Sequence, residues 1–198
     1  MISYEEFAAN CQDVLERIEQ ACLACGRKKD SVVLLPVTKT HLYLAVEYAH
    51  RYGFLAIGEN RVQEAVEKKG QTPAKVRWEL IGHLQSNKAK QAVATFDRIQ
   101  SLDSPELALR IDRLAGESGK VMPVLLQANA GGDPAKFGAA DFDGLLKLAD
   151  VAMGAPNLQV EGLMTIPALD ADLEVARMAF ETLRNWREKL ESRFGRKL

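Results

Sequence analysis

Lys39 is the residue of this sequence whose position predicts the most specific chemistry. It ends the segment 32–39, a mostly apolar run, so we expect its amine at the end of a buried strand. Partial desolvation there would favour the neutral amine, the nucleophile that forms a Schiff base with a carbonyl. The alternative is a lysine whose stem packs while its ammonium reaches water or pairs with a phosphate.

Further candidate side chains follow the later apolar runs of the chain. Asn60 follows the second run, His83 and Asn87 follow the third, and Met164 lies in the sixth. Parallel strands gather their carboxyl ends at one rim, where converging polar groups predict a binding site. In the alternative reading, the asparagines cap helices and the methionine packs in the core.

The Cys22-x-x-Cys25 pair invites a metal or redox interpretation. However, Cys11, Cys22 and Cys25 share a helical stripe with apolar residues, and no second Cys or His pair follows at zinc-site spacing. We therefore expect core cysteines. Ser3 and Glu6 form a capping box at the start of this helix, and Gly26 is its expected stop.

Short β-rich runs alternate with helical patterns after this first helix. Their starts recur about every 22 residues, the repeat of a βα unit, except for a longer interval before the last. The six predicted strands are Val32–Lys39, Phe54–Gly58, Val76–Gly82, Asp97–Asp103, Val121–Asn129 and Leu158–Ala168. No glycine-rich phosphate loop follows the first strand, so a (β/α) barrel of the TIM type is favoured over an open nucleotide-binding sheet. Such a barrel closes with eight strands, and we count six.

The composition describes one α/β domain over residues 1–198. The chain is 47% hydrophobic and 27% charged, with 26 basic residues against 27 acidic ones and a net charge of −1. This balance argues against a nucleic-acid partner, and the apolar runs are too short to cross a membrane. No secretory signal is visible, so a cytoplasmic protein is expected.

Several motifs follow one another in order along the chain. They are Thr38-Lys39-Thr40, Ile57–Glu64, Ile81–Lys88, Ile99–Asp103, Asn129, Lys136–Gly138 and Gly162–Pro167. Together they resemble the YggS/PROSC family of pyridoxal-phosphate-binding proteins, in which a motif similar to Thr38-Lys39-Thr40 carries the Schiff-base lysine. The similarity extends from about Val33 to the final helix.

This resemblance implies a barrel like the N-terminal domain of alanine racemase. It also implies that the protein, like the members of the YggS/PROSC family, binds pyridoxal 5'-phosphate and buffers or delivers it without established catalytic turnover. Lys39 would form the Schiff base, with Asn60 beside the ring and Met164 among the ring-side contacts. His83 and Asn87 are further cofactor-binding candidates at the rim. No catalytic residue and no metal site is expected.

Two departures from the family pattern stand out. Glu79 follows Trp78 where the family usually has histidine, and alternation favours Glu79 on the opposite face from Trp78 and Leu80. The family also continues beyond this sequence with two strands that supply its phosphate-binding turns. We therefore expect a barrel that is incomplete at the C-terminus. A partner chain or a dimer would then cover its open edge.

Two alternatives to a cofactor carrier stay open. A racemase-like enzyme would need a second acid/base, yet all four tyrosines fall in the first two predicted helices. A cofactor-free remnant that acts as a binding protein is motivated by the absent phosphate turns.

Overall fold

The computed structural model describes residues 2–170 and 172–198, and these form two compact units. The first unit comprises the described residues up to Glu59 together with Gln63–Arg77, and the second comprises Asn60–Val62 and the described residues from Trp78 onward. Across the described ranges, no helix has both the length and the apolar character needed to cross a bilayer.

The first unit consists mainly of helices. Its elements are α1 (Tyr4–Ala24), the 3-10 turn η1 (Lys29–Ser31), α2 (Leu44–Tyr52), β1 (Ala56–Glu59) and most of α3 (Val62–Lys69). The predicted capping box is confirmed, because the Ser3 hydroxyl accepts the Glu6 amide and Glu6 accepts the Ser3 amide. Cys11 and Cys22 are buried as expected, but Cys25 is exposed at the helix end, so the prediction of a core position is wrong there.

The predicted first strand, Val32–Lys39, is wrong in extent. Only Val37 forms a β-bridge, to Gly58 in the same unit, and Val33 is 85% exposed. The segment is bonded through the amide of Thr38, which donates to the Gly58 carbonyl, and through the Pro36 carbonyl, which accepts from the Gly58 amide. The described residues therefore contain five strands instead of the six predicted.

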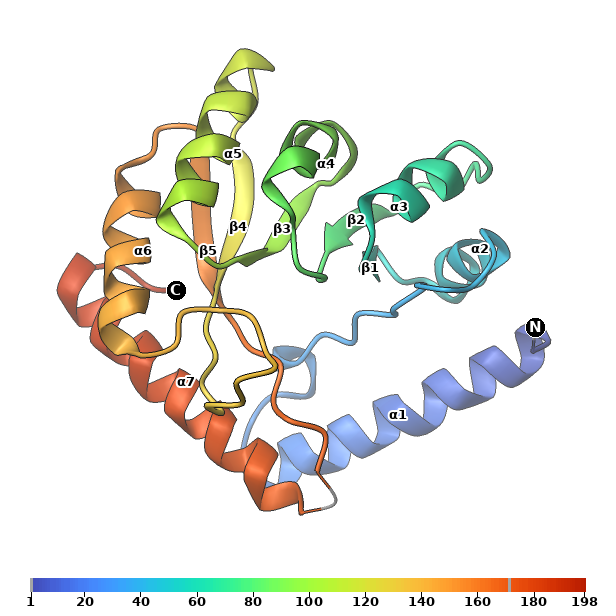
Figure 1. The fold of residues 1–198 in the computed structure, drawn as a ribbon. Helices are drawn as coiled ribbons and strands as arrows, with labels where there is room; N and C mark the ends of the chain where they lie inside the picture. Colours follow the sequence, from blue (N-terminus) through green and yellow to red (C-terminus); the bar gives the residue numbers. More distant parts are fainter. Residues whose placement is uncertain (1, 171) are drawn as a thin grey trace. The chain divides into compact units, whose positions relative to one another are not determined.

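The second unit alternates strands and helices as the βα repeat predicts (Figure 1). Its elements are β2 (Arg77–Leu80), η2 (Ser86–Lys88), α4 (Ala89–Thr95), β3 (Arg98–Leu102), α5 (Pro105–Glu117), β4 (Met122–Gln127), α6 (Phe142–Gly154), β5 (Leu158–Met164) and α7 (Leu173–Phe194). Neighbouring strands from β2 to β5 pair in parallel and in chain order. Parallel pairing brings their carboxyl ends to one edge.

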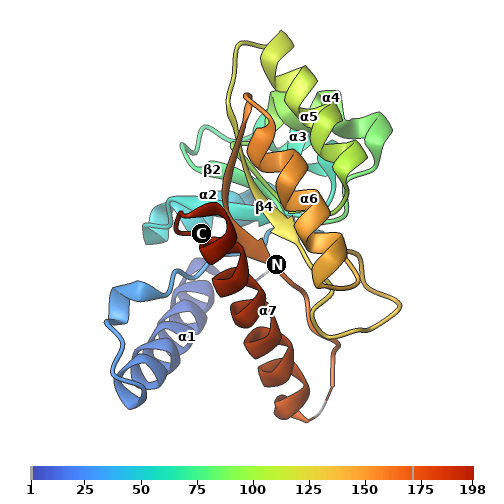
Figure 2. The same cartoon turned by 90° about the vertical axis from the view of Figure 1, so that its left-hand side faces the viewer.

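Helices bury one face of this sheet. Ile99, Leu102, Val124 and Leu126 on β3 and β4 are fully buried, as are Ile111 on α5 and Leu145 and Leu148 on α6. Figure 2 shows α6 and α7 beside the β4–β5 part of the sheet. Ser104 caps α5 and Pro105 occupies its first turn, which confirms the predicted helix start. Burial of this apolar surface fixes where each strand ends and therefore where the rim side chains lie.

Candidate functional site

Lys39 occupies the second position of a tight turn in the first unit. The amide of His41 donates to the carbonyl of Thr38 over 3.2 Å, which closes the turn around Lys39 and Thr40. The side chain of Lys39 is exposed and has no hydrogen-bond or ion-pair partner among the described residues. The expectation of a partly desolvated amine is wrong for this structure, because Lys39 lies in an exposed turn and not at the end of a buried strand.

Thr40 adopts a left-handed backbone conformation, with a φ of 64°. This region costs energy for a β-branched residue, and turns that need it usually place glycine or asparagine there. The amide of Thr40 donates to Oε1 of Glu64 over 2.5 Å. The structure therefore holds a strained residue directly after the candidate lysine.

A buried cation lies beneath this turn. The ammonium of Lys68 donates to the Thr38 carbonyl over 2.6 Å, and to carboxylate oxygens of Glu59 and Glu64 over 2.7 Å each. The Thr38 hydroxyl donates to the same Glu59 oxygen over 2.5 Å. The Lys68 side chain is 7% exposed and that of Glu59 fully buried, so both charges depend on these partners. We call Thr38, Glu59, Glu64 and Lys68 the Lys68 network.

The spacing of residues along α3 indicates this network, although the residue types alone do not. Val62, Ala65 and Lys68 are the buried positions of α3, which places the lysine on the inward stripe of its helix. Lysine is almost never buried unless it is paired. A lysine on such a stripe, four residues after Glu64, therefore indicates a buried ion pair.

The loops after β1 and β2 meet within the second unit at Asn60 and Gly82. A Cβ atom at Gly82 would collide with the backbone of Asn60, so only glycine permits this approach. Asn60, predicted as a cofactor contact, is thereby fixed by its main chain. Asn87 is exposed in η2, and α4 takes Lys88 as its N-cap.

His83 lies at the carboxyl end of β2 with two partners from later strands. Its Nδ1 is 3.0 Å from Oδ2 of Asp103, and its ring stacks on Phe137 with centroids 3.8 Å apart. The loop that carries Phe137 lies against the end of β4 at Gly138. This glycine has a φ of 116°, and a Cβ atom there would collide with the backbone of Ala128 and Asn129. The structure therefore brings His83, Asp103 and Phe137 together, although the sequence identified only His83 as a site residue.

Met164 ends β5 and pairs with Gln127, and its carbonyl accepts the amide of Ala128. Three oxygens near the carboxyl ends of β3, β4 and β5 are buried without a hydrogen-bond partner in the described part of the chain: Ser101 Oγ, Gln127 Oε1 and Thr165 Oγ1. Buried polar atoms are normally satisfied. These three strand ends therefore each hold a buried oxygen whose hydrogen-bonding capacity is unused.

Glu79 belongs to a second charged cluster, on the strands of the second unit. Its carboxylate accepts from Gln100 over 2.6 Å and pairs with Arg98, directly opposite on β3, at 3.3 Å. Arg98 also pairs with Glu161 on β5 at 2.6 Å. We call Glu79, Arg98, Gln100 and Glu161 the Arg98 network. The carboxylate at position 79 is thus neutralised by its own sheet.

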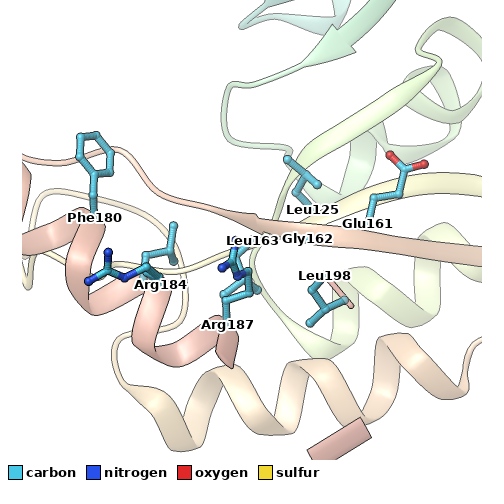
Figure 3. A pocket seen from close by; sticks show the side chains of 9 residues that line it. Leu125, Glu161, Gly162, Leu163, Phe180, Arg184, Arg187 and Leu198 are labelled. Atoms are coloured by element: carbon cyan, nitrogen blue, oxygen red, sulfur yellow. The ribbon is translucent and has the colours of Figure 1, made fainter. Parts of the chain in front are cut away.

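A cavity of about 390 Å³ lies between β4, β5 and α7 (Figure 3). Leu125 and Leu163 of the sheet and Arg184 and Arg187 of α7 line it. It contains none of the predicted site residues, and of its two arginines Arg184 is exposed to solvent and Arg187 is partly buried. Within the described ranges, no three His, Cys, Asp or Glu side chains are grouped to hold a metal ion.

Comparisons with known proteins agree on one family. The family model described as alanine racemase, N-terminal domain, matches residues 2–197. A pyridoxal phosphate homeostasis protein from Vibrio alginolyticus is 33% identical over 190 residues, covering 93% of this chain and 81% of that protein. PipY from Synechococcus elongatus PCC7942, solved with PLP bound, matches with a TM-score of 0.77 at 33% identity, covering 89% of this chain and 82% of that one.

The predicted fold class is confirmed by these matches. Alanine racemase from Clostridium difficile matches 96% of this chain and 49% of its own, with a TM-score of 0.73 at 14% identity. At that identity the likeness concerns the fold alone.

Proposed function

Because the chain belongs to the alanine racemase N-terminal domain family, among its pyridoxal phosphate homeostasis proteins, we propose that it binds pyridoxal phosphate and that Lys39 attaches it as a Schiff base. Attachment to Lys39 rests chiefly on one observation. An exposed amine without an ionic partner in the described chain projects from a turn whose backbone is held on both sides.

The residues present fit this cofactor. When bound, pyridoxal phosphate supplies an aldehyde carbon, which condenses with a primary amine and releases water. The exposed side chain of Lys39 meets the requirement for access, and the amine must lose a proton before it can attack. The unsatisfied oxygens of Ser101, Gln127 and Thr165 offer hydrogen-bonding positions for a polar ligand in the second unit.

The rim of the second unit supplies the further contacts that we propose. Asn60 presents a side-chain amide from a fixed backbone, and Met164 presents a thioether at the end of β5. His83 is oriented by Asp103 and Phe137 and offers an aromatic face and a ring nitrogen. Asn87 is an exposed amide on the same loop as His83.

A carrier role without substrate turnover, in the cytoplasm, is the form of this function that we propose. Racemisation needs a second acid/base opposite the lysine. The tyrosines that could serve belong to α1 and α2 and their caps. Tyr4 packs edge-on against Tyr48 at 5.5 Å, and Tyr52 stacks on Phe54 at 5.1 Å, so these rings contribute to packing.

Titration with pyridoxal phosphate, followed by absorbance, tests the proposal. The wild-type chain is expected to develop the band of a protonated Schiff base, and Lys39→Ala to lose it. Lys75→Ala, which removes another exposed lysine of the first unit, is the matched control and should retain the band. Absence of the band from the wild-type chain at saturating cofactor, or its retention in Lys39→Ala, would refute the proposal.

A further inference from the structure

We infer that Lys68 and Glu64 are positioning residues for Lys39, which hold its turn in a strained conformation that directs the amine. This inference rests on the proposed function and adds two residues to it. Neither residue needs to touch the cofactor. They act on the peptide groups on either side of Lys39, through hydrogen bonds within the first unit.

Thr38, the residue before Lys39, is held by its hydrogen bonds. The Thr38 carbonyl accepts two hydrogen bonds, from the His41 amide and from the Lys68 ammonium. The Thr38 hydroxyl donates to Glu59, and the Thr38 amide donates to Gly58. Every polar group of Thr38 is therefore engaged, and the peptide that leads into Lys39 has a single orientation.

Thr40, the residue after Lys39, is held in a strained conformation. Thr40 is exposed and β-branched, and its φ of 64° is a conformation that its own preferences disfavour. Such a conformation persists only where surrounding contacts enforce it. The contact here is Glu64, whose Oε1 accepts the Thr40 amide.

The ammonium of Lys68 connects the contacts on the two sides of Lys39. The same Oε1 atom of Glu64 accepts from Lys68, 2.7 Å away, so Lys68 orients the carboxylate that holds Thr40 as well as the carbonyl of Thr38. A charge-assisted hydrogen bond from a buried ammonium is stronger than a neutral one. The network thus clamps the two peptides that flank Lys39 to helix α3.

Strained backbone conformations gather at functional sites, where neighbouring contacts hold reactive groups in place. The turn that the His41–Thr38 hydrogen bond closes places Thr40 at a left-handed position, and the exposed side chain of Thr40 gains no packing that would offset the strain. We attribute the strain at Thr40 to the orientation that this turn gives to Lys39. Small errors in the position of a reacting group can slow a reaction by up to on the order of 100-fold.

Amide hydrogen exchange tests the physical link without any cofactor. In the wild-type chain the Thr40 amide should exchange slowly for an exposed turn. Glu64→Ala should accelerate it about tenfold or more, whereas Glu64→Gln, which keeps an acceptor oxygen, should retain part of the protection. Glu67→Ala, an exposed acid on the same helix, is the matched control. Rapid exchange of Thr40 in the wild-type chain would overturn the inference.

Reductive trapping with pyridoxal phosphate and cyanoborohydride tests the consequence. Mass spectrometry would give the rate of labelling at Lys39 relative to Lys75 in the same molecule, so general loss of structure alters both residues. Glu64→Ala should lower this ratio on the order of 10-fold, Glu64→Gln should restore part of it, and Glu67→Ala should leave it unchanged.

Different results would refute the proposed function and the positioning role. If the wild-type chain shows no preferential label at Lys39, the proposed function fails, while the exchange of Thr40 still reports on the clamp. If the wild-type chain labels Lys39 and Glu64→Ala does so at the same relative rate, the positioning role is wrong and the proposed function stands.

Discussion

Each unit of the molecule places one cation between two carboxylates, but the two clusters are attached to different parts of the backbone. In the Lys68 network, the ammonium binds Glu59, Glu64 and a carbonyl of the turn that holds Lys39. In the Arg98 network, the guanidinium binds Glu79 and Glu161 and joins β3 to the strands that carry them. One cluster holds a loop, and the other holds a sheet.

The difference shows how the surroundings of similar charges determine their role. Arg98 is 29% exposed and links strands whose hydrogen bonds already fix their register. Water therefore solvates part of its charge, and the strands stay aligned without it. Lys68 is 7% exposed and holds a turn with no sheet of its own beyond one bridge. The Lys68 network is therefore expected to matter more, for stability and for Lys39.

The largest effect is expected from Lys68→Met. This substitution keeps the length of the stem but leaves Glu59, which is fully buried, without its counter-charge. Breaking a buried pair in this way costs about 3–5 kcal/mol of unfolding free energy. Urea unfolding followed by circular dichroism measures it, with Lys75→Met as a control expected within about 0.5 kcal/mol of wild type. A loss below about 1 kcal/mol would show that the charges are not paired in solution.

A smaller effect is expected from Arg98→Met. Its removal leaves Glu79 with Gln100 as its remaining partner in the network and takes from Glu161 its ion pair with Arg98. We expect a loss of about 1–3 kcal/mol of unfolding free energy in the same urea experiment. Labelling of Lys39 relative to Lys75 should remain at the wild-type value. If Arg98→Met lowered this labelling ratio as much as is expected for Glu64→Ala, the Lys68 network would have no special role in positioning Lys39.

Thr40→Gly separates stability from positioning. Glycine adopts a φ of 64° without strain but costs chain entropy, so unfolding free energy should be unchanged or higher by up to about 2 kcal/mol. Labelling of Lys39 should nevertheless become slower, because the turn is freer to move. A clear loss of stability, or labelling as fast as in wild type, would contradict a turn strained for function.

The smallest effect concerns the thiols of Cys11 in α1 and of Cys25 at its C-cap, both in the first unit. Burial raises the pKa of Cys11 above its ordinary value of 9.0, so its thiolate is scarcer at any pH below that value. Iodoacetamide should alkylate the exposed Cys25 before Cys11. The stabilisation from the neutral Cys11 thiol is complete below its unfolded pKa and is lost as pH rises through its folded value. Equal alkylation rates for Cys11 and Cys25 in the wild-type chain would contradict the burial of Cys11. In the Lys68→Met variant, faster alkylation of Cys11 would show that the first unit opens.

Sequence reasoning located most elements because burial leaves a periodic pattern. The last five predicted strands correspond to β1–β5 within a few residues, and Ser3 and Ser104 marked helix starts correctly. The first predicted strand shrank to a bridge at Val37, because an apolar run shows that a segment is apolar but not how many neighbours pair with it.

The candidate site was predicted only in part, because its support comes from contacts between distant residues. Lys39 and Asn60 were recognisable from local motifs. The acceptance of the Thr40 amide by Glu64, the collision that excludes a side chain at Gly82, and the stacking of Phe137 on His83 all join separate loops. The pattern of residues along each strand carries no information on the distances between loops, so these contacts could not be predicted.

The most direct test of the account is to map the modified lysine. The wild-type chain would be saturated with pyridoxal phosphate, reduced with borohydride, digested and sequenced by mass spectrometry. The account predicts the phosphopyridoxyl group on Lys39, in the peptide that contains Thr38 and Thr40. A label found on another lysine, or spread evenly over the exposed lysines, would contradict it.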